Sequence, residues 1–136
     1  MIYYLNKENI PTIPSLHDCV VKKVEIKQDF LTFVFEDNIS AHDSIKRHQP
    51  EAKSLIIKIH LIDDFDTYKL KDYKTPVCND TYVHIDNQQL CILAEEGCLE
   101  YLYHYIGYES IIIKLFCDTY ICLDVRADYI EFEWIM

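Results

Sequence analysis

Apolar and polar residues alternate one by one over much of this chain, and that period of two restricts what it can fold into. Between residues 19 and 35, apolar residues recur at alternate positions in two runs separated by Gln28 and Asp29. A period of two directs alternate side chains to opposite faces of a β-strand. A two-residue turn at Gln28 and Asp29 puts Ile26 opposite Leu31, so both runs direct their apolar side chains to one core. We therefore predict an antiparallel hairpin over residues 19–35.

The middle of the chain repeats the alternation less regularly. Residues 54–62 predict a third strand. Its inward residues are Leu55, Ile57, Ile59 and Leu61. Weaker strands are predicted over residues 67–73 and 81–85. Residues 36–53 are mostly polar and include Pro50, which predicts a long loop.

The stretch from Ser110 to the C-terminus predicts a three-strand meander. In its first hairpin, a loop at residues 118–120 brings two runs of apolar residues opposite each other. The same register sets Lys114 opposite Asp124, which would form a surface ion pair of small value.

The second hairpin of the meander is predicted to turn at residues 127 and 128. This reversal sets Ile121 opposite Trp134, so we expect Trp134 to be largely buried. It also sets Glu131 opposite Asp124, which places two like charges side by side.

Residues 88–106 fit two structures. An apolar stripe with helical spacing runs through them, with Asp86 placed to cap a helix and Gly107 placed to end it. Gly97 weakens the middle of such a helix. The alternation from Leu99 to Tyr105 fits a strand instead. We favour the helix.

Together these elements predict one α+β domain, mainly β, over residues 1–136. It would contain antiparallel hairpins, a C-terminal three-strand meander and one helix. A chain of 136 residues fits a single domain, and 50% hydrophobic residues supply a core without a metal or a disulfide.

The six cysteines are predicted to be free thiols. No pair has Cys-x-x-Cys spacing, and Cys117 and Cys122 fall on opposite faces of their hairpin. The first seven residues lack a basic region followed by a long apolar run, so we expect no signal peptide. The longest purely apolar runs, residues 1–5 and 90–94, are too short for a membrane helix. We therefore expect a cytoplasmic protein in a reducing compartment, without a membrane partner.

The charge of the chain is negative and unevenly distributed. The formal net charge is −10, and residues 75–136 hold only Lys114 and Arg126 against 11 acidic residues. A basic surface for nucleic acid is missing, and anionic membranes would repel the protein. A basic protein partner would be attracted, although acidity also keeps a protein soluble.

The predicted partner-binding face is the acidic C-terminal half. Its candidate residues are Glu95, Glu96, Glu100, Asp124, Glu131 and Glu133. A second candidate surface consists of Tyr101, Tyr103, Tyr105 and Tyr108. Tyrosine is enriched at protein interfaces because it joins apolar area to a hydroxyl group, but a role in the core is the commoner explanation.

An alternative is a small metal-binding protein or enzyme that uses histidine and aspartate. The motif Ser-x-His-Asp occurs twice, at His17-Asp18 and at His42-Asp43, although chance also yields such pairs. Histidine and carboxylate groups hold metals or exchange protons. Cys19 has no visible activating feature as a nucleophile. Residues 63–66 are acidic but lack the glycine and the terminal glutamate of an EF-hand, which favours a solvated turn.

Motifs that hold cofactors are missing from the sequence. Its two glycines, Gly97 and Gly107, allow no dinucleotide fingerprint, no P-loop and no nucleophile elbow. A His-Glu-x-x-His pair for zinc is also missing. We therefore expect no cofactor, and a binding protein rather than an enzyme.

Two short stretches resemble a known group of proteins. Ser15-Leu16-His17-Asp18, followed by a strand, a tight turn and a second strand, resembles small bacterial immunity-protein-like, β-rich proteins associated with toxin systems. The closing Ile130-Glu131-Phe132-Glu133-Trp134 resembles their last strand. The resemblance implies a non-enzymatic, toxin-neutralising role and carries no functional residue across. The charge and the resemblance together predict a protein-binding module, of the type of an immunity inhibitor of a basic toxin.

Overall fold

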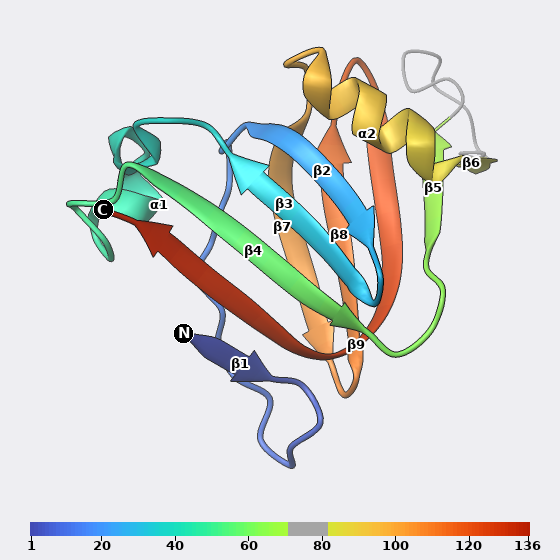
Figure 1. The fold of residues 1–136 in the computed structure, drawn as a ribbon, viewed down its shortest axis with the longest axis horizontal. Helices are drawn as coiled ribbons and strands as arrows, with labels where there is room; N and C mark the ends of the chain where they lie inside the picture. Colours follow the sequence, from blue (N-terminus) through green and yellow to red (C-terminus); the bar gives the residue numbers. More distant parts are fainter. Residues whose placement is uncertain (71–81) are drawn as a thin grey trace, which may run out of the picture.

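The computed structural model describes residues 1–70 and 82–136, and it is mainly β (Figure 1). The strands of the described residues are β1 (Ile2–Tyr4), β2 (Val21–Lys27), β3 (Phe30–Phe35), β4 (Ser54–Leu61), β5 (Asp66–Leu70), β6 (Tyr82–Ile85), β7 (Glu100–Gly107), β8 (Ser110–Phe116) and β9 (Tyr120–Ile135). The helical segments are the 3-10 turn η1 (Ile39–Ala41), α1 (Asp43–Lys46) and α2 (Asn87–Glu95). The prediction of a mainly β fold built from antiparallel strands is confirmed.

The long strand β9 belongs to two sheets. Its first half pairs with β8 and with β5. Its second half, from Ala127 onward, pairs with β4 and with β1. The first sheet therefore has the order β2-β3-β4-β9-β1, and the second sheet has the order β7-β8-β9-β5-β6, with every pair antiparallel.

The two sheets also meet at the starts of β2 and β7. The Val21 N–H donates to the carbonyl of Leu99, and the Tyr101 N–H donates to the carbonyl of Cys19, each at 2.8 Å. These bonds close the circuit β2-β3-β4-β9-β8-β7, so the strands form a ring with few unpaired edges. Figure 1 shows α2 lying across one end of these strands.

Alternate side chains of both sheets fill the space between them. The rings of Phe33, Phe35 and Tyr101 are buried there, with centroids 5.9 to 6.5 Å apart. The helix α2 packs on β2 and adds Leu90 and Ala94 to this core. A cavity of about 10 Å³ beside Phe33 and Tyr101 is too small for a ligand.

The hairpin predicted over residues 19–35 is confirmed in its register. A turn at Gln28 and Asp29 joins β2 to β3 and sets Ile26 opposite Leu31. Gln28 has a φ of 56°, in the left-handed region that tight hairpin turns require. The strand predicted over residues 54–62 is also confirmed as β4.

The predicted reversal at residues 127 and 128 is wrong, because β9 runs through both residues without turning back. The pairing of β4 with β9 shifts by one residue there, so that Asp128 is an extra residue in β9. A β-bulge of this kind bends the strand and moves the following side chains to the other face. The buried positions of β9 accordingly change from odd numbers before the bulge to even numbers after it.

Two predictions that depended on this reversal are therefore wrong. Trp134 lies opposite Leu55 of β4 instead of Ile121, and it is only half-buried. Glu131 lies opposite Lys58 instead of a like charge.

The β8–β9 hairpin forms as predicted, but its turn lies one residue earlier, at residues 117–119 instead of 118–120. Phe116 pairs with Tyr120, so the register differs by two residues from the predicted one. Lys114 consequently lies opposite Cys122 rather than Asp124, and the predicted ion pair is wrong. A shift of two residues leaves every side chain on its predicted face, which is why the predicted core positions are correct.

Residues 88–106 contain a helix followed by a strand, so the single predicted helix is half right. Asp86 caps α2, since its Oδ1 accepts a hydrogen bond of 2.9 Å from the N–H of Gln88. The helix ends at Glu95, and Gly97 then adopts a φ of 78°, as glycine commonly does after a helix. The strand β7 follows.

The remaining connections differ in detail from the predictions. The loop predicted over residues 36–53 contains η1 and α1. The two weaker strands form as β5 and β6, while residues 71–73 and 81 of the predicted ranges lie outside the described residues. None of the helices in residues 1–70 and 82–136 is long and apolar enough to cross a membrane.

The prediction of six free thiols is wrong, because Cys98 and Cys117 form a disulfide with their Cα atoms 5.2 Å apart. The ladder between β7 and β8 sets Glu100 opposite Phe116, which places both cysteines just beyond its end. Only the sequence-local pair of Cys117 and Cys122 had been considered, and that pair is indeed not bonded.

Candidate functional site

The outer face of the second sheet gathers most of the exposed aromatic side chains of β5 to β9. We call it the tyrosine face. It consists of Asp66, Tyr68, Tyr82, His84, Tyr103, Tyr105, Ile112, Lys114, Phe116, Tyr120, Cys122 and Asp124. In β9 these positions alternate with the buried residues Ile121, Leu123 and Val125, so the period of two directs them away from the core.

Two exposed tyrosines of β7 belong to this face. Tyr103 is 44% exposed and Tyr105 is 61% exposed, and their rings meet edge to face at a centroid distance of 5.5 Å. Each lies opposite a residue of β8, Tyr103 opposite Lys114 and Tyr105 opposite Ile112. The face thus offers large aromatic area on rigid strands, with hydroxyl groups at its surface.

Two carboxylates lie side by side on the tyrosine face. Asp66 of β5 is directly opposite Asp124 of β9. The only ion pair found for either carboxylate in the described residues joins Asp66 Oδ1 to His84 Nε2, at 3.2 Å. The charge of Asp66, with burial and Asp124 as smaller causes, raises the pKa of Tyr68 above its ordinary value. Directly opposed like charges are unfavourable in an isolated sheet, so this pair favours a cation that binds over it.

A cation already lies on the tyrosine face. The Nζ atom of Lys114 lies over the ring of Tyr82, 5.2 Å from its centroid. This cation–π contact shows how the face accommodates a basic side chain.

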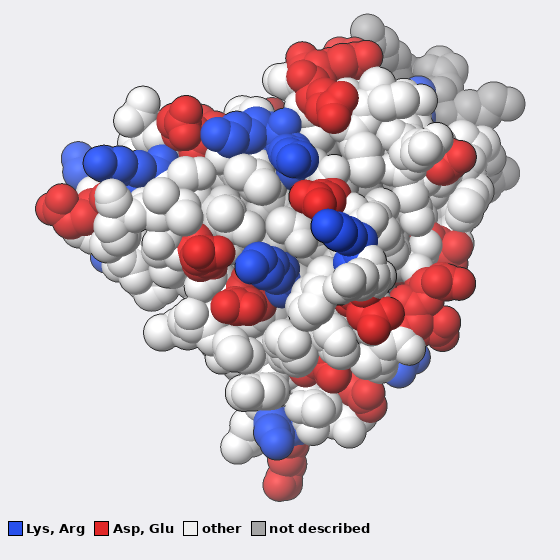
Figure 2. Space-filling view, in the orientation of Figure 1, with Lys and Arg blue, Asp and Glu red and all other residues white. Residues whose placement is uncertain are grey.

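The predicted acidic residues are spread over several elements. Only Asp124 belongs to the tyrosine face. Glu131 and Glu133 lie on the outer face of the first sheet, where Glu133 Oε2 is 3.9 Å from Lys58 Nζ. Figure 2 shows acidic and basic side chains interspersed over β2, β3 and β4. Acidic side chains predominate near the connection from β4 to β5, where residues 63, 64 and 66 are exposed.

The other three predicted acidic residues lie near the end of α2 and the start of β7. Glu95 and Glu96 are exposed at the C-terminal end of α2. Glu100 is half-buried at the start of β7. Burial, followed by the charge of Asp18 and a hydrogen bond with it, raises the pKa of the Glu100 carboxyl above its ordinary value.

The two Ser-x-His-Asp motifs meet at one open cleft, which the sequence did not predict. The cleft has a volume of about 380 Å³ and is lined by His17, Asp18, Ala41, His42, Asp43 and Ser44. The hydrogen bonds that join residues 18–21 to the start of β7 hold the first motif there, and η1 and α1 hold the second.

The histidines of this cleft are oriented by hydrogen bonds. His17 Nδ1 donates to the carbonyl of Leu102 at 2.8 Å, which leaves Nε2 at 3.4 Å from Asp18 Oδ1. His42 Nε2 lies 3.2 Å from Glu36 Oε2, and the same carboxylate oxygen accepts a short hydrogen bond from the N–H of Val20. Imidazole and carboxylate groups held in this way can transfer protons.

Cys19 does not supply a nucleophile to this cleft. Burial, with the charges of Glu36 and Asp18, raises the pKa of the Cys19 thiol to about 12. A protonated and buried thiol is unreactive.

The cleft also lacks a preformed set of metal ligands. Within the described residues, potential ligand atoms of Cys98, Cys117 and Asp118 lie within 4.8 Å of one another, and these residues are not part of the cleft. The arrangement at the cleft therefore fits proton transfer better than a resident metal ion.

The predicted tyrosine surface is only partly correct. Tyr103 and Tyr105 belong to the tyrosine face, while Tyr101 is 2% exposed and lies in the core. Its hydroxyl is 2.7 Å from His104 Nδ1. Tyr68, Tyr82 and Tyr120 were missed, because only the pairing of β9 with β5 and β8 brings them to one face.

Comparison with known proteins adds no relative: no family model, no curated protein and no solved structure matches this chain.

Proposed function

We propose that this protein is a protein-binding module whose tyrosine face binds a basic protein. The observation that carries the proposal is the direct opposition of Asp66 and Asp124 at one end of an exposed aromatic face. This arrangement complements a partner that presents arginine or lysine side chains.

The chemistry of the face supports protein binding. Tyrosine buries a large area at a small cost in side-chain entropy, and its hydroxyl group finds hydrogen bonds at the rim of an interface. Arginine and lysine bind carboxylates and also stack on aromatic rings. The contact between Lys114 and Tyr82 is an example of the second mode within the chain.

The net charge of −10 supports a basic partner. Long-range attraction raises the rate at which oppositely charged proteins associate. We propose that the partner is a basic toxin domain and that this protein inhibits it, in the manner of the immunity-like proteins that its first hairpin resembles.

The proposal is tested with two charge reversals of equal size. The products of the genes next to this one are co-expressed with it, and association kinetics are measured with a product whose toxicity it suppresses. The double variant Asp66→Lys/Asp124→Lys should associate more slowly at low ionic strength, and Tyr105→Ala should dissociate faster. The matched control is Glu131→Lys/Glu133→Lys, which changes the same charge on the other sheet.

The proposal is rejected if no neighbouring product is bound. It is also rejected if the control variant loses binding while the Asp66/Asp124 variant keeps it. In that case the first sheet, with the predicted residues Glu131 and Glu133, is the binding face.

A second candidate function is a small enzyme or metal-binding protein that uses the cleft. The observation that favours it is the meeting of His17-Asp18 and His42-Asp43 beside Glu100, whose pKa is raised by burial and by Asp18. The variant His17→Asn/His42→Asn distinguishes the two functions. It should keep full binding of the basic partner if the tyrosine face is the functional site, and it should lose hydrolytic activity or bound metal if the cleft is.

A further inference from the structure

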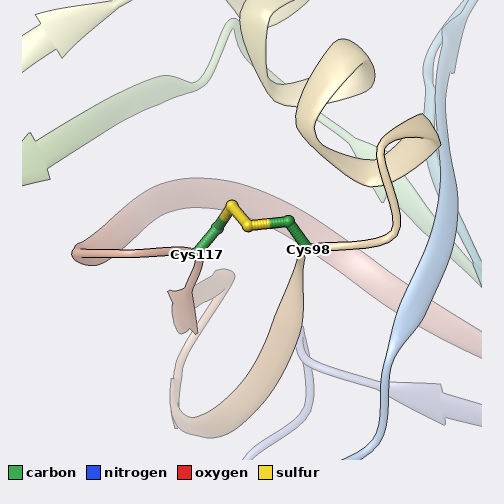
Figure 3. The surroundings of a disulfide bond; sticks show 2 residues. All are labelled: Cys98 and Cys117. Carbon is green, nitrogen blue, oxygen red and sulfur yellow. A yellow bond between two sulfur atoms is a disulfide. The ribbon is translucent and has the colours of Figure 1, made fainter.

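Figure 3 shows the disulfide between Cys98 and Cys117. A third potential metal ligand, Asp118, lies beside it. Cys98 follows Gly97 after the end of α2, and Cys117 follows the last residue of β8. Asp118 comes next, with a φ of 63°, at the start of the turn to β9. The two sulfur atoms and a carboxylate oxygen of Asp118 lie within 4.8 Å of one another.

These are ligand types that zinc uses in proteins. Zinc binds thiolate sulfur at about 2.3 Å and carboxylate oxygen at about 2.0–2.2 Å in tetrahedral geometry, which requires about 3.8 Å between two bound sulfurs. The Cα atoms of Cys98 and Cys117 are 5.2 Å apart, close enough for side-chain rotation to meet that separation. Asp118 is exposed, so a fourth position is open to water.

We propose that Cys98, Cys117 and Asp118 form a zinc site when the disulfide is reduced. The bonded sulfurs of the oxidised protein have no thiolate to offer a metal, so binding of zinc and the disulfide exclude each other. The inference does not depend on the proposed function.

The exchange between the two states balances in electrons and protons. A dithiol transfers two electrons and two protons to the disulfide, which breaks the bond between the sulfurs and leaves two thiols, while the dithiol becomes its own disulfide. Zinc then binds both sulfurs and releases two protons, and the Asp118 carboxylate adds a third bond without a further proton.

Hydrogen bonds, in addition to the disulfide, fix the backbone around the site. The β7–β8 ladder ends with Glu100 opposite Phe116. Beyond it, the Cys117 N–H donates to the carbonyl of Thr119 at 3.0 Å, and the Thr119 hydroxyl donates to the carbonyl of Leu70 at 2.9 Å. These bonds fix the turn that carries Cys117 and Asp118, and the β7–β8 ladder places Cys98 next to it.

Other cysteines are replaced in the test protein, so that a thiolate signal can come only from Cys98 and Cys117. In the reference variant, Cys78, Cys91 and Cys122 are replaced by serine, which leaves Cys98, Cys117 and Cys19. Cys19 is buried and its thiol stays protonated, so it does not compete for metal.

The test uses Co²⁺ as a spectroscopic probe in place of zinc. The full chain of the reference variant is reduced with dithiothreitol, freed of it under anaerobic conditions and titrated with Co²⁺. We expect one equivalent to bind, with a thiolate-to-cobalt charge-transfer band in the near ultraviolet and tetrahedral bands in the visible region. Zinc should displace the cobalt, and the oxidised protein should show neither band.

Further variants assign the ligands. Cys98→Ser/Cys117→Ser should lose the charge-transfer band, and Asp118→Asn should weaken binding by roughly tenfold, the scale of losing one supporting group at a metal site. Asp63→Asn, which removes another exposed carboxylate, is the matched control and should bind cobalt as the reference does. His17→Asn/His42→Asn should also keep the band, which separates this site from the cleft.

Circular dichroism decides whether the reduced protein is folded. A reduced protein that keeps its fold without a thiolate band overturns the proposal, as does a reduced protein that unfolds. A band that survives in Cys98→Ser/Cys117→Ser overturns it as well.

Discussion

His104 shows how burial of one residue links stability to pH. Its Nδ1 is 2.7 Å from the Tyr101 hydroxyl, and it is also hydrogen-bonded to the backbone of Ile13. Burial lowers the pKa of His104 below its ordinary value of 6.5, despite the opposing effect of the Ile13 hydrogen bond. The neutral imidazole can then accept a hydrogen bond from the Tyr101 hydroxyl at Nδ1.

The sign of the pH dependence follows from this direction. Since the unfolded chain binds a proton at a higher pH than the folded one, the contribution of His104 is complete above about pH 6.5 and is lost as the pH falls through the folded pKa. We expect His104→Gln to be less sensitive than wild type to a change from pH 7.5 to pH 5. Urea unfolding of both proteins at the two pH values measures the difference, and equal losses would contradict the assignment.

Phe132 and Trp134 share a face of β9 but differ in burial. Phe132 is 2% exposed and packs on Tyr3, whereas Trp134 is half-buried at the strand end. Phe132→Ala should therefore lower the free energy of unfolding by about 3–5 kcal/mol, and Trp134→Ala should cost clearly less. Chemical denaturation of the two variants checks this order. A larger loss for Trp134→Ala would mean that this end of β9 is more deeply covered.

At the scale of elements, the two ends of α2 depend on single residues. Asp86→Ala removes the acceptor for the Gln88 N–H and should lower the free energy of unfolding by about 1 kcal/mol, whereas Asp86→Asn retains an acceptor and should lower it less.

Gly97→Ala should also lower the free energy of unfolding by about 1 kcal/mol, because its φ of 78° is unfavourable for alanine. No atom lies within 4 Å of the added methyl group, so backbone strain is the whole cause. Thermal unfolding measures all three, and an unchanged midpoint for Gly97→Ala would rule out the strain.

The strand β9 holds both sheets together through its bulge. The extra residue, Asp128, accepts a hydrogen bond from His60 Nδ1 at 2.7 Å, and the ring of His60 stacks on Tyr129. The bend lets one strand leave the second sheet and enter the first. This bend, rather than the predicted reversal at residues 127 and 128, determines which face each acidic residue of β9 occupies.

At the scale of the whole molecule, the disulfide links the end of α2 to the second sheet. The disulfide occupies two of the six cysteines, so no more than four thiols should titrate in the unfolded, unreduced protein. The bond spans 19 positions in the chain, and its reduction should lower the free energy of unfolding by about 3 kcal/mol. Ellman titration and urea unfolding with and without reductant measure both effects, and six titratable thiols would show that the bond is absent.

A loss of that size leaves a domain of ordinary stability folded, because such domains unfold at a cost of about 5–15 kcal/mol. The reduced state is therefore accessible to the proposed zinc site. The expectation of a reducing cytoplasm remains a prediction, and it determines which of the two states the cell contains.

Local patterns in the sequence were sufficient to predict the elements that depend on residues close to one another in the chain. The hairpin at Gln28 and Asp29, the inward residues of β4 and the cap at Asp86 all follow from contacts within a few residues. The period of two identified most buried positions of the strands that it covered, because it depends only on alternate side chains facing opposite sides of a strand. Ile26 is an exception, since it is 37% exposed, and buried residues of the connections, such as Ile39 and Ile45, carry no such signal.

Contacts between distant segments decided the rest. The change of buried parity near Asp128 fits a turn or a bulge equally well, and only the pairing of β9 with β4 selects the bulge. The ring closure at Val21 and Leu99 likewise brings the His17 motif to the cleft. The tyrosine face and the meeting of the two His-Asp motifs bring together segments far apart in the chain, because register between such segments is set by packing of the whole core and not by local sequence. The Cys98–Cys117 bond was missed for another reason, because the stretch that contains β7 was assigned to a helix.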